Sequence, residues 1–130
     1  MTNLLIVDDE QSIRSMLRMF FQRQGYAVSV AGDGAEAIRI AKTQAFDLIL
    51  MDIQMPVMTG IEAVRALRED ETYRERPIIA FTAYARSHTP ASLQTSGFDR
   101  VVFKPFELIE LHELVGQLIA GHSSADAQTV

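Results

Sequence analysis

Five side chains with chemistry of their own stand at or just after the ends of short apolar runs: Asp8, Asp9, Asp52, Thr82 and Lys104. Three carboxylates brought close together repel one another unless a cation neutralises them, and all-oxygen ligands favour a hard ion such as Mg²⁺. A lysine and a hydroxyl beside such an ion would neutralise the oxygens of a transferring phosphoryl group, and a carboxylate can act as its nucleophile. These residue types therefore indicate phosphoryl transfer, provided that the fold brings them together.

Each of these residues also has a structural interpretation that involves no chemistry. Asp9 or Glu10 could cap the helix that follows them. Asp52 could be an ordinary loop aspartate, and Thr82 could be a β-branched strand residue. Lys104 closes an apolar strand and must either extend its ammonium group to solvent or find a partner. Their joint occurrence at the ends of strands favours a common site.

Short apolar runs alternate with helical patterns along the whole chain, as in a parallel sheet with right-handed crossovers and helices on both faces. In an open sheet of this kind, ligands bind at the carboxyl ends of the strands, where the polar residues above would converge. We expect residues 1–120 to form one domain and residues 121–130 to form a flexible tail or the start of a linker. Strands are expected at residues 4–7, 27–30, 48–51, 78–81 and 101–103, and helices at residues 11–24, 34–44, 60–69, 90–97 and about 106–119.

The composition is that of a globular domain, with 130 residues of which 48% are hydrophobic and 22% charged. The absence of cysteine excludes disulfides, thiolate zinc sites and cysteine nucleophiles. The net charge of −5 argues against direct binding of nucleic acid or of anionic membranes. With no long apolar run and no leader-like N-terminus, we expect a cytoplasmic protein.

Four segments of the chain resemble those of response-regulator receiver domains, the CheY-like superfamily of two-component signalling. The likeness covers residues 3–119, and the four segments occur in the family's order. It implies an α/β fold, namely a (βα)5 doubly wound five-stranded parallel sheet with the flavodoxin-like strand order 2-1-3-4-5. The segments are LLIVDDE, DLILMDIQMPVMTGIEAVRALR, PIIAFTAYA and GFDRVVFKPF.

The resemblance implies a metal site and a phosphorylation site in the same place. Asp52 resembles the family's phosphoacceptor. Asp8 and Asp9 resemble its metal-binding pair, with Asp9 as the more direct ligand. Together with Asp52 and the backbone carbonyl of Gln54, they would hold Mg²⁺ as the cofactor.

The same resemblance implies the contacts of the phosphoryl group and the class of its donor. The Thr82 hydroxyl, the Ala83 backbone amide and the Lys104 ammonium group would contact the phosphoryl group. The donor would be a phosphohistidine of a histidine kinase or of a histidine phosphotransfer protein, and a downstream protein would read the result. Such a domain is a signalling phosphoacceptor and not an enzyme, although it assists its own phosphorylation and dephosphorylation. The MDIQMPVM segment resembles receivers of hybrid kinases, which favours a phosphorelay.

Val101 departs from the family pattern, which places Tyr or Phe three residues before the lysine. Valine is short and stiff about χ1, so it cannot make the large side-chain movement that accompanies phosphorylation in the family. We expect the loop at 83–88 and the helix from Pro90 to take up that movement. The surface read by partners should then centre on residues 84–96 and the last helix.

Three other classes of protein compete with this interpretation. A haloacid-dehalogenase-like phosphatase also forms an aspartyl phosphate, but it places an Asp-x-Asp pattern after the first strand, where this chain has Asp8-Asp9-Glu10. A dinucleotide-binding domain would carry a glycine fingerprint in its first turn. A phosphorylation-independent docking module would be expected to lack Asp52, Thr82 or Lys104.

Overall fold

The computed structural model, which describes residues 1–83 and 90–128, contains one five-stranded parallel sheet with the strand order β2-β1-β3-β4-β5. The expected α/β fold and strand order are confirmed. The strands are β1 (Asn3–Val7), β2 (Ala27–Ala31), β3 (Leu48–Asp52), β4 (Ile78–Thr82) and β5 (Arg100–Phe103). The helices are α1 (Gln11–Arg23), α2 (Gly34–Thr43), α3 (Gly60–Glu69), the 3-10 helix η1 (Glu71–Tyr73), α4 (Pro90–Ser96) and α5 (Leu108–Gln128).

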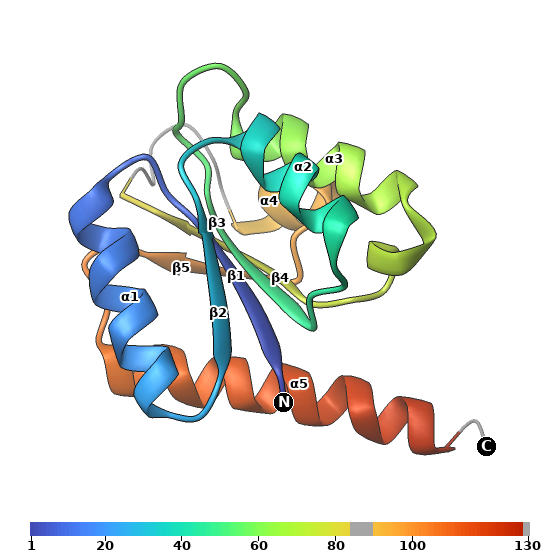
Figure 1. Cartoon of the computed structure of the whole chain (residues 1–130). Coiled ribbons are helices and arrows are strands. Elements are labelled where there is room, and N and C mark those ends of the chain that lie inside the picture. The colour runs from blue at the N-terminus through green and yellow to red at the C-terminus, as the bar shows by residue number, and fades with distance from the viewer. Residues whose placement is uncertain (84–89, 129–130) are drawn as a thin grey trace.

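Helices cover both faces of the sheet (Figure 1). On one face, α1 and α5 bury Leu17, Phe21, Leu111 and Val115 against the strands. On the other face, α2, α3 and α4 cover a second core to which Leu93 of α4 belongs. Because both faces are covered, the central strands β3 and β4 are buried along their whole length, which explains why their sequences are continuously apolar until the last residue.

The boundaries of the elements differ from the expected ones mainly at the C-terminus. The last helix was expected to end near residue 119, where its apolar pattern stops, but α5 continues to Gln128. A helix that is already formed gains one hydrogen bond for each residue added, and the alanines beyond residue 119 favour its continuation. The expected cap at Thr89 and most of the expected loop at 83–88 lie outside the described residues.

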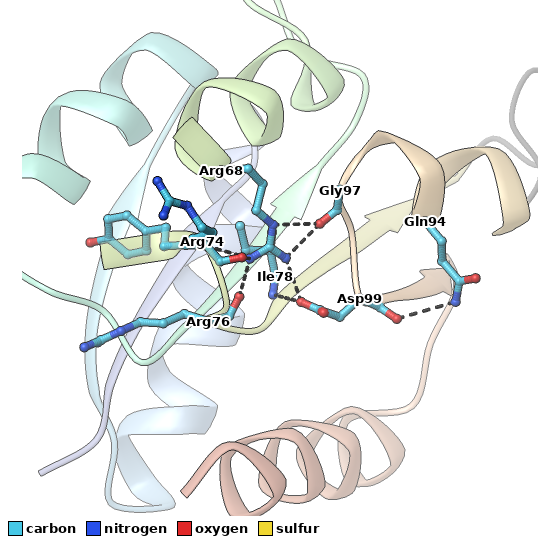
Figure 2. Close-up of polar contacts among 8 residues, drawn as sticks. Arg68, Arg74, Arg76, Ile78, Gln94, Gly97 and Asp99 are labelled. Atoms are coloured by element: carbon cyan, nitrogen blue, oxygen red, sulfur yellow. Dashed lines mark hydrogen bonds and ion pairs between the residues drawn. The ribbon is translucent and has the colours of Figure 1, made fainter. Parts of the chain in front are cut away.

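Arg68, in the last turn of α3, joins three parts of the chain (Figure 2). Its guanidinium group donates to the carbonyl oxygen of Gly97 at 2.9 and 2.7 Å, and to the Asp99 carboxylate at 2.8 Å. It also donates to the carbonyl oxygens of Tyr73 and Arg76, each at 2.7 Å. Hydrogen bonds to a charged donor are among the stronger ones, so the C-terminal end of α4 is fastened to α3 and to the start of β4.

Candidate functional site

Three carboxylates meet at the carboxyl ends of β1 and β3, as the sequence predicted. These strands are adjacent and parallel, with Val7 opposite Met51, so the residues that follow them lie side by side. One oxygen each from Asp8, Asp9 and Asp52 lies within 4.8 Å of the other two. Asp8 and Asp52 are buried and Asp9 is exposed. Buried acids at this spacing need a cation, so the cluster has the composition of a site for a hard metal ion.

Asp8 is held in place by the turn that leads into α1. Its Oδ1 accepts a hydrogen bond of 2.8 Å from the Glu10 backbone N–H, and its own carbonyl oxygen accepts one of 2.7 Å from Arg14 Nη1. Glu10 stands at the N-cap position of α1, but within the described part of the chain its side chain makes no capping hydrogen bond. The capping interpretation is therefore wrong for Glu10. The role of Arg14 had no signal in the sequence, because its acceptor is a backbone carbonyl.

Lys104 supplies the positive charge of the site from the residue after β5. Its Nζ lies 2.8 Å from Asp8 Oδ2 and 3.5 Å from Asp52 Oδ2, and its side chain is 16% exposed. The Lys104 backbone N–H donates to the Thr82 carbonyl oxygen at 2.8 Å, which fixes the lysine beside the end of β4. Lys104 is therefore not a solvent-extended lysine but part of the acidic site.

Burial and charge shift the pKa values of the two central groups. Desolvation by burial raises the pKa of Asp52 to about 6, with the Asp8 charge adding to the rise and the Lys104 charge opposing it. Burial by itself would lower the pKa of Lys104, but its hydrogen bond to Asp8 and the charges of Asp52 and Asp8 outweigh burial and raise it. The lysine therefore stays charged at neutral pH, whereas Asp52 takes up a proton more readily than an ordinary aspartate does.

The remaining residues of the expected site lie at the same edge of the sheet. Thr82 is the last residue of β4 and is fully buried, and Ala83 follows it with its side chain exposed. The Gln54 backbone N–H lies 3.4 Å from Asp52 Oδ1, which places the turn after β3 next to the carboxylate. The structure therefore brings the three acids and Lys104 together, with Thr82, Ala83 and Gln54 at the same edge of the sheet.

Gly60 positions the loop between β3 and α3, and sequence reasoning missed it. Its backbone N–H donates to the Ile53 carbonyl oxygen at 2.9 Å, and a Cβ at this position would collide with the Asp52 carbonyl oxygen and lie 2.8 Å from Ile53 Cα. The start of α3 therefore touches the backbone of the proposed acceptor itself. Thr59 and Glu62 form a capping box around Gly60, a sequence signal that marks where the helix starts but not this close approach.

Val57, in the same loop, has a backbone conformation that is unfavourable for its side chain. Its φ angle is 69°, in the left-handed region, which a β-branched residue rarely adopts. Its side chain is 86% exposed, so packing does not compensate. The loop beside Asp52 therefore carries local strain.

Val101 lies in the middle of β5, opposite Ala80. Its half-buried side chain packs against the core beneath α2, α3 and α4. Val101 therefore places a small side chain where the resemblance predicted an aromatic ring. This side chain points to the face of the sheet that α4 covers.

The doubly wound sheet and the acidic site at its carboxyl edge together define a class of protein. The sequence profile of the Response regulator receiver domain family matches residues 4–116, and the chain belongs to this family. Receiver domains are signalling phosphoacceptors that histidine kinases phosphorylate, so the chain is a signalling module and not an enzyme with a separate substrate. Membership of this family excludes two of the competing interpretations, the haloacid-dehalogenase-like phosphatase and the dinucleotide-binding domain.

One relative is the CAI-1 autoinducer sensor kinase/phosphatase CqsS of Vibrio cholerae serotype O1. It is 43% identical to the chain over 103 residues, which is 78% of this chain and 15% of CqsS. The chain therefore spans only a small part of that relative.

Two solved structures resemble the whole domain. The chemotaxis protein CheY4 of Vibrio cholerae has a TM-score of 0.85 and 36% identity, over 91% of this chain and 98% of that one. The receiver domain of the sensor histidine kinase PA1611 of Pseudomonas aeruginosa has a TM-score of 0.84 and 33% identity, over 92% and 98% of the two chains. The PA1611 structure holds a magnesium ion in its active-site cleft. Within residues 1–83 and 90–128 of the present chain, no helix is both long and apolar enough to cross a membrane.

Proposed function

We propose that Asp52 is the residue that accepts the phosphoryl group. The observation that carries this proposal is the position of its carboxylate, which is buried beside the Asp8 carboxylate and 3.5 Å from the Lys104 ammonium group. Burial raises its pKa to about 6, so at neutral pH most of the carboxylate is ionised and poorly solvated. A poorly solvated anion gives up little hydration when it attacks, which favours its use as a nucleophile.

The same residues suit Mg²⁺. Three carboxylates face one ammonium group, which leaves a net negative charge that a divalent cation can neutralise. Asp8, Asp9, Asp52 and the backbone carbonyl of Gln54 would hold the ion. When bound, Mg²⁺ would supply charge neutralisation for the oxygens of the transferring group.

In the proposed reaction, a carboxylate oxygen of Asp52 attacks the phosphorus atom of a phosphohistidine. The new O–P bond forms as the N–P bond breaks, and the electron pair of the broken bond stays on the imidazole nitrogen. The Thr82 hydroxyl and the Ala83 backbone amide would donate hydrogen bonds to the phosphoryl oxygens. Lys104 would pair with the same oxygens, moving away from Asp8 to do so.

The phosphoryl donor would be a histidine kinase or a histidine phosphotransfer protein, and this chain would act in the cytoplasm. The likeness to a sensor kinase/phosphatase supports the view that this receiver acts within a phosphorelay. Residues 1–120 would be the functional unit, and residues 121–130 would extend from it as a tail or the start of a linker. The acidic chain would bind neither nucleic acid nor membrane directly and would signal to a downstream protein.

Labelling with a small phosphodonor tests the acceptor. With Mg²⁺ and acetyl phosphate, intact mass should show one added phosphoryl group on the wild type and none on Asp52→Asn. Asp47→Asn, which removes a carboxylate just before β3, at the other end of the strand, should still be labelled. Labelling of Asp52→Asn would show that another residue accepts the phosphoryl group. No labelling of the wild type would leave the phosphorylation-independent docking module as the better interpretation.

The response to phosphorylation should centre on residues 84–96 and α5, of which residues 84–89 lie outside the described part of the chain. The observation that favours α4 is that the side-chain hydroxyls of Thr95 and Ser96 each donate to the backbone carbonyl four residues earlier, a type of bond that slightly destabilises a helix. Amide exchange with and without a phosphoryl mimic is the test. Protection should change at 83–96 in the wild type and much less in Thr82→Ala. A response confined to another face would contradict this route.

A further inference from the structure

Lys104 Nζ has an aromatic neighbour as well as its two carboxylates. It lies 4.9 Å from the centroid of the Phe81 ring, over the face of that ring. Phe81 is the residue before Thr82 in β4 and is only 1% exposed. The Lys104 ammonium group therefore contacts the carboxylates of Asp8 and Asp52 and also an aromatic face. The ring and the threonine of the expected site occupy adjacent positions of β4.

Phe81 is buried on a strand that is paired on both sides. Its backbone pairs with Asp52 on β3 and with Val102 on β5. Its ring contacts the Phe106 ring edge to face at a centroid distance of 6.2 Å, and Phe106 itself packs against the core beneath α1 and α5. Burial and the pairing of its strand on both sides therefore set the position of the ring beside the lysine.

An aromatic face and an aliphatic side chain would affect a buried ammonium group differently. Both would shield it from water, which disfavours its charge. The ring face also attracts the cation electrostatically, and the attraction grows when water is excluded. Because the ring accepts no strong hydrogen bond, the N–H donors of the ammonium group stay available for oxygens.

We propose that Phe81 is a positioning residue for Lys104, holding the ammonium group within reach of both carboxylates so that it can pass to an incoming phosphoryl group. The proposal rests on the function proposed for Asp52 and deepens it. The ring touches neither Asp52's reacting oxygen nor the phosphoryl donor in this scheme, and it acts only through the lysine. Phe81→Leu removes the ring, and Phe106→Leu is the matched control, because it removes a ring from the same cluster and leaves Phe81 in place.

The first test detects the contact without any phosphorylation. The chain has only two lysines, so protein labelled with ¹³C-lysine gives two sets of Cε signals, and Lys42 on the exposed side of α2 is the internal reference. The Lys104 Cε protons should be shifted upfield by the ring in the wild type and in Phe106→Leu. In Phe81→Leu the shift should be lost. Equal spectra for the wild type and Phe81→Leu would overturn the contact.

The second test measures the consequence for the reaction. The rate of labelling by acetyl phosphate in Mg²⁺ should fall about two- to thirtyfold in Phe81→Leu and less than about twofold in Phe106→Leu. Fluorinated phenylalanines placed at position 81 keep the shape of the ring and weaken its negative face, so the rate should fall step by step with fluorine content. Equal rates for both leucine variants, or no dependence on fluorination, would overturn the proposal. If the wild type is not labelled but the Lys104 Cε protons are shifted, the phosphoacceptor role proposed for Asp52 is wrong, whereas the contact between Phe81 and Lys104 is real.

Discussion

Lys104 Nζ lies closer to Asp8 than to Asp52, at 2.8 Å against 3.5 Å. The better ion pair is thus made with the flanking acid and not with the proposed acceptor. Asp8 is fully buried, so the lysine is the group that keeps its charge compensated in the absence of a metal.

Lys104→Met should therefore destabilise the protein at neutral pH without Mg²⁺, by about 3 kcal/mol, because it leaves a buried carboxylate unpaired. Saturating Mg²⁺ should restore part of that loss, since the ion binds the folded state and supplies positive charge. Urea denaturation with and without Mg²⁺ measures both effects. Lys42→Met on α2 should change the free energy of unfolding by less than about 0.5 kcal/mol, and an equal effect of the two variants would contradict the prediction.

Asp52→Asn should stabilise the protein at pH 7.5 without Mg²⁺. The pKa of Asp52 is raised to about 6 in the folded state from an ordinary value of 3.8, so the folded state binds the proton more tightly than the unfolded state does. The stability of the wild type therefore falls as pH rises from about 4 to 6, by up to about 3 kcal/mol. Denaturation should show the advantage of the variant at pH 7.5 and little of it near pH 4. With Mg²⁺ at pH 7.5 the order should reverse, and an advantage that is constant with pH would count against this origin.

Asp9→Ala should weaken Mg²⁺ binding strongly, whereas Glu10→Ala should leave it within about twofold of the wild type. Asp9 belongs to the carboxylate cluster, while Glu10 only occupies the N-cap position of α1. Both residues are exposed, so neither change should alter stability much in the absence of metal. Titration with Mg²⁺ followed by NMR separates the two variants. Similar affinities for both would mean that Asp9 is not a ligand.

Gly60→Ala should both destabilise the protein, by about 2 kcal/mol, and slow the labelling of Asp52. Its new methyl group would press on backbone atoms of Asp52 and Ile53, which cannot move aside as a flexible side chain can. Gly116→Ala in α5 is the control, because a methyl group there meets no described atom within 4 Å. That change should stabilise the helix by about 1 kcal/mol and leave labelling unaltered. Thermal denaturation and labelling rates give both results.

Val57→Gly should raise the free energy of unfolding by about 1 kcal/mol. Glycine adopts a φ of 69° without the steric cost that valine incurs, and this gain exceeds the entropy that glycine adds to the unfolded chain. Because Val57 is 86% exposed, little packing is lost. Urea denaturation measures the change, and a less stable variant would show that the left-handed conformation is not retained in solution.

The fold was predictable because its signals are local. Apolar runs of four residues, such as 48–51 and 78–81, are too short for helices and fit strands buried on both faces. Their alternation with helical patterns favours a parallel sheet. The convergence of Asp8, Asp52 and Lys104 followed from that topology, since parallel strands end at one edge.

The remaining features depend on approaches in space that leave no sequence signal. Arg14 bonds to a backbone carbonyl, Gly60 lies against the backbone of Asp52, and Phe81 faces Lys104 from the neighbouring strand. From the sequence alone, Arg14 is an ordinary arginine in a helix, Gly60 is a glycine at the start of a helix, and Phe81 is an apolar residue of a strand. Only the packed structure distinguishes them from others of their type.

The attachment of α4 at Gly97 limits how that helix can move. A helix held at one end by the Arg68 guanidinium group can swing about that end but cannot slide along its own axis. With seven residues, α4 is about 10 Å long, so a swing of about 20° displaces its first turn by about 3–4 Å while Gly97 stays in place. The first turn of α4 thus becomes the long arm of a lever whose fulcrum is an arginine on the neighbouring helix.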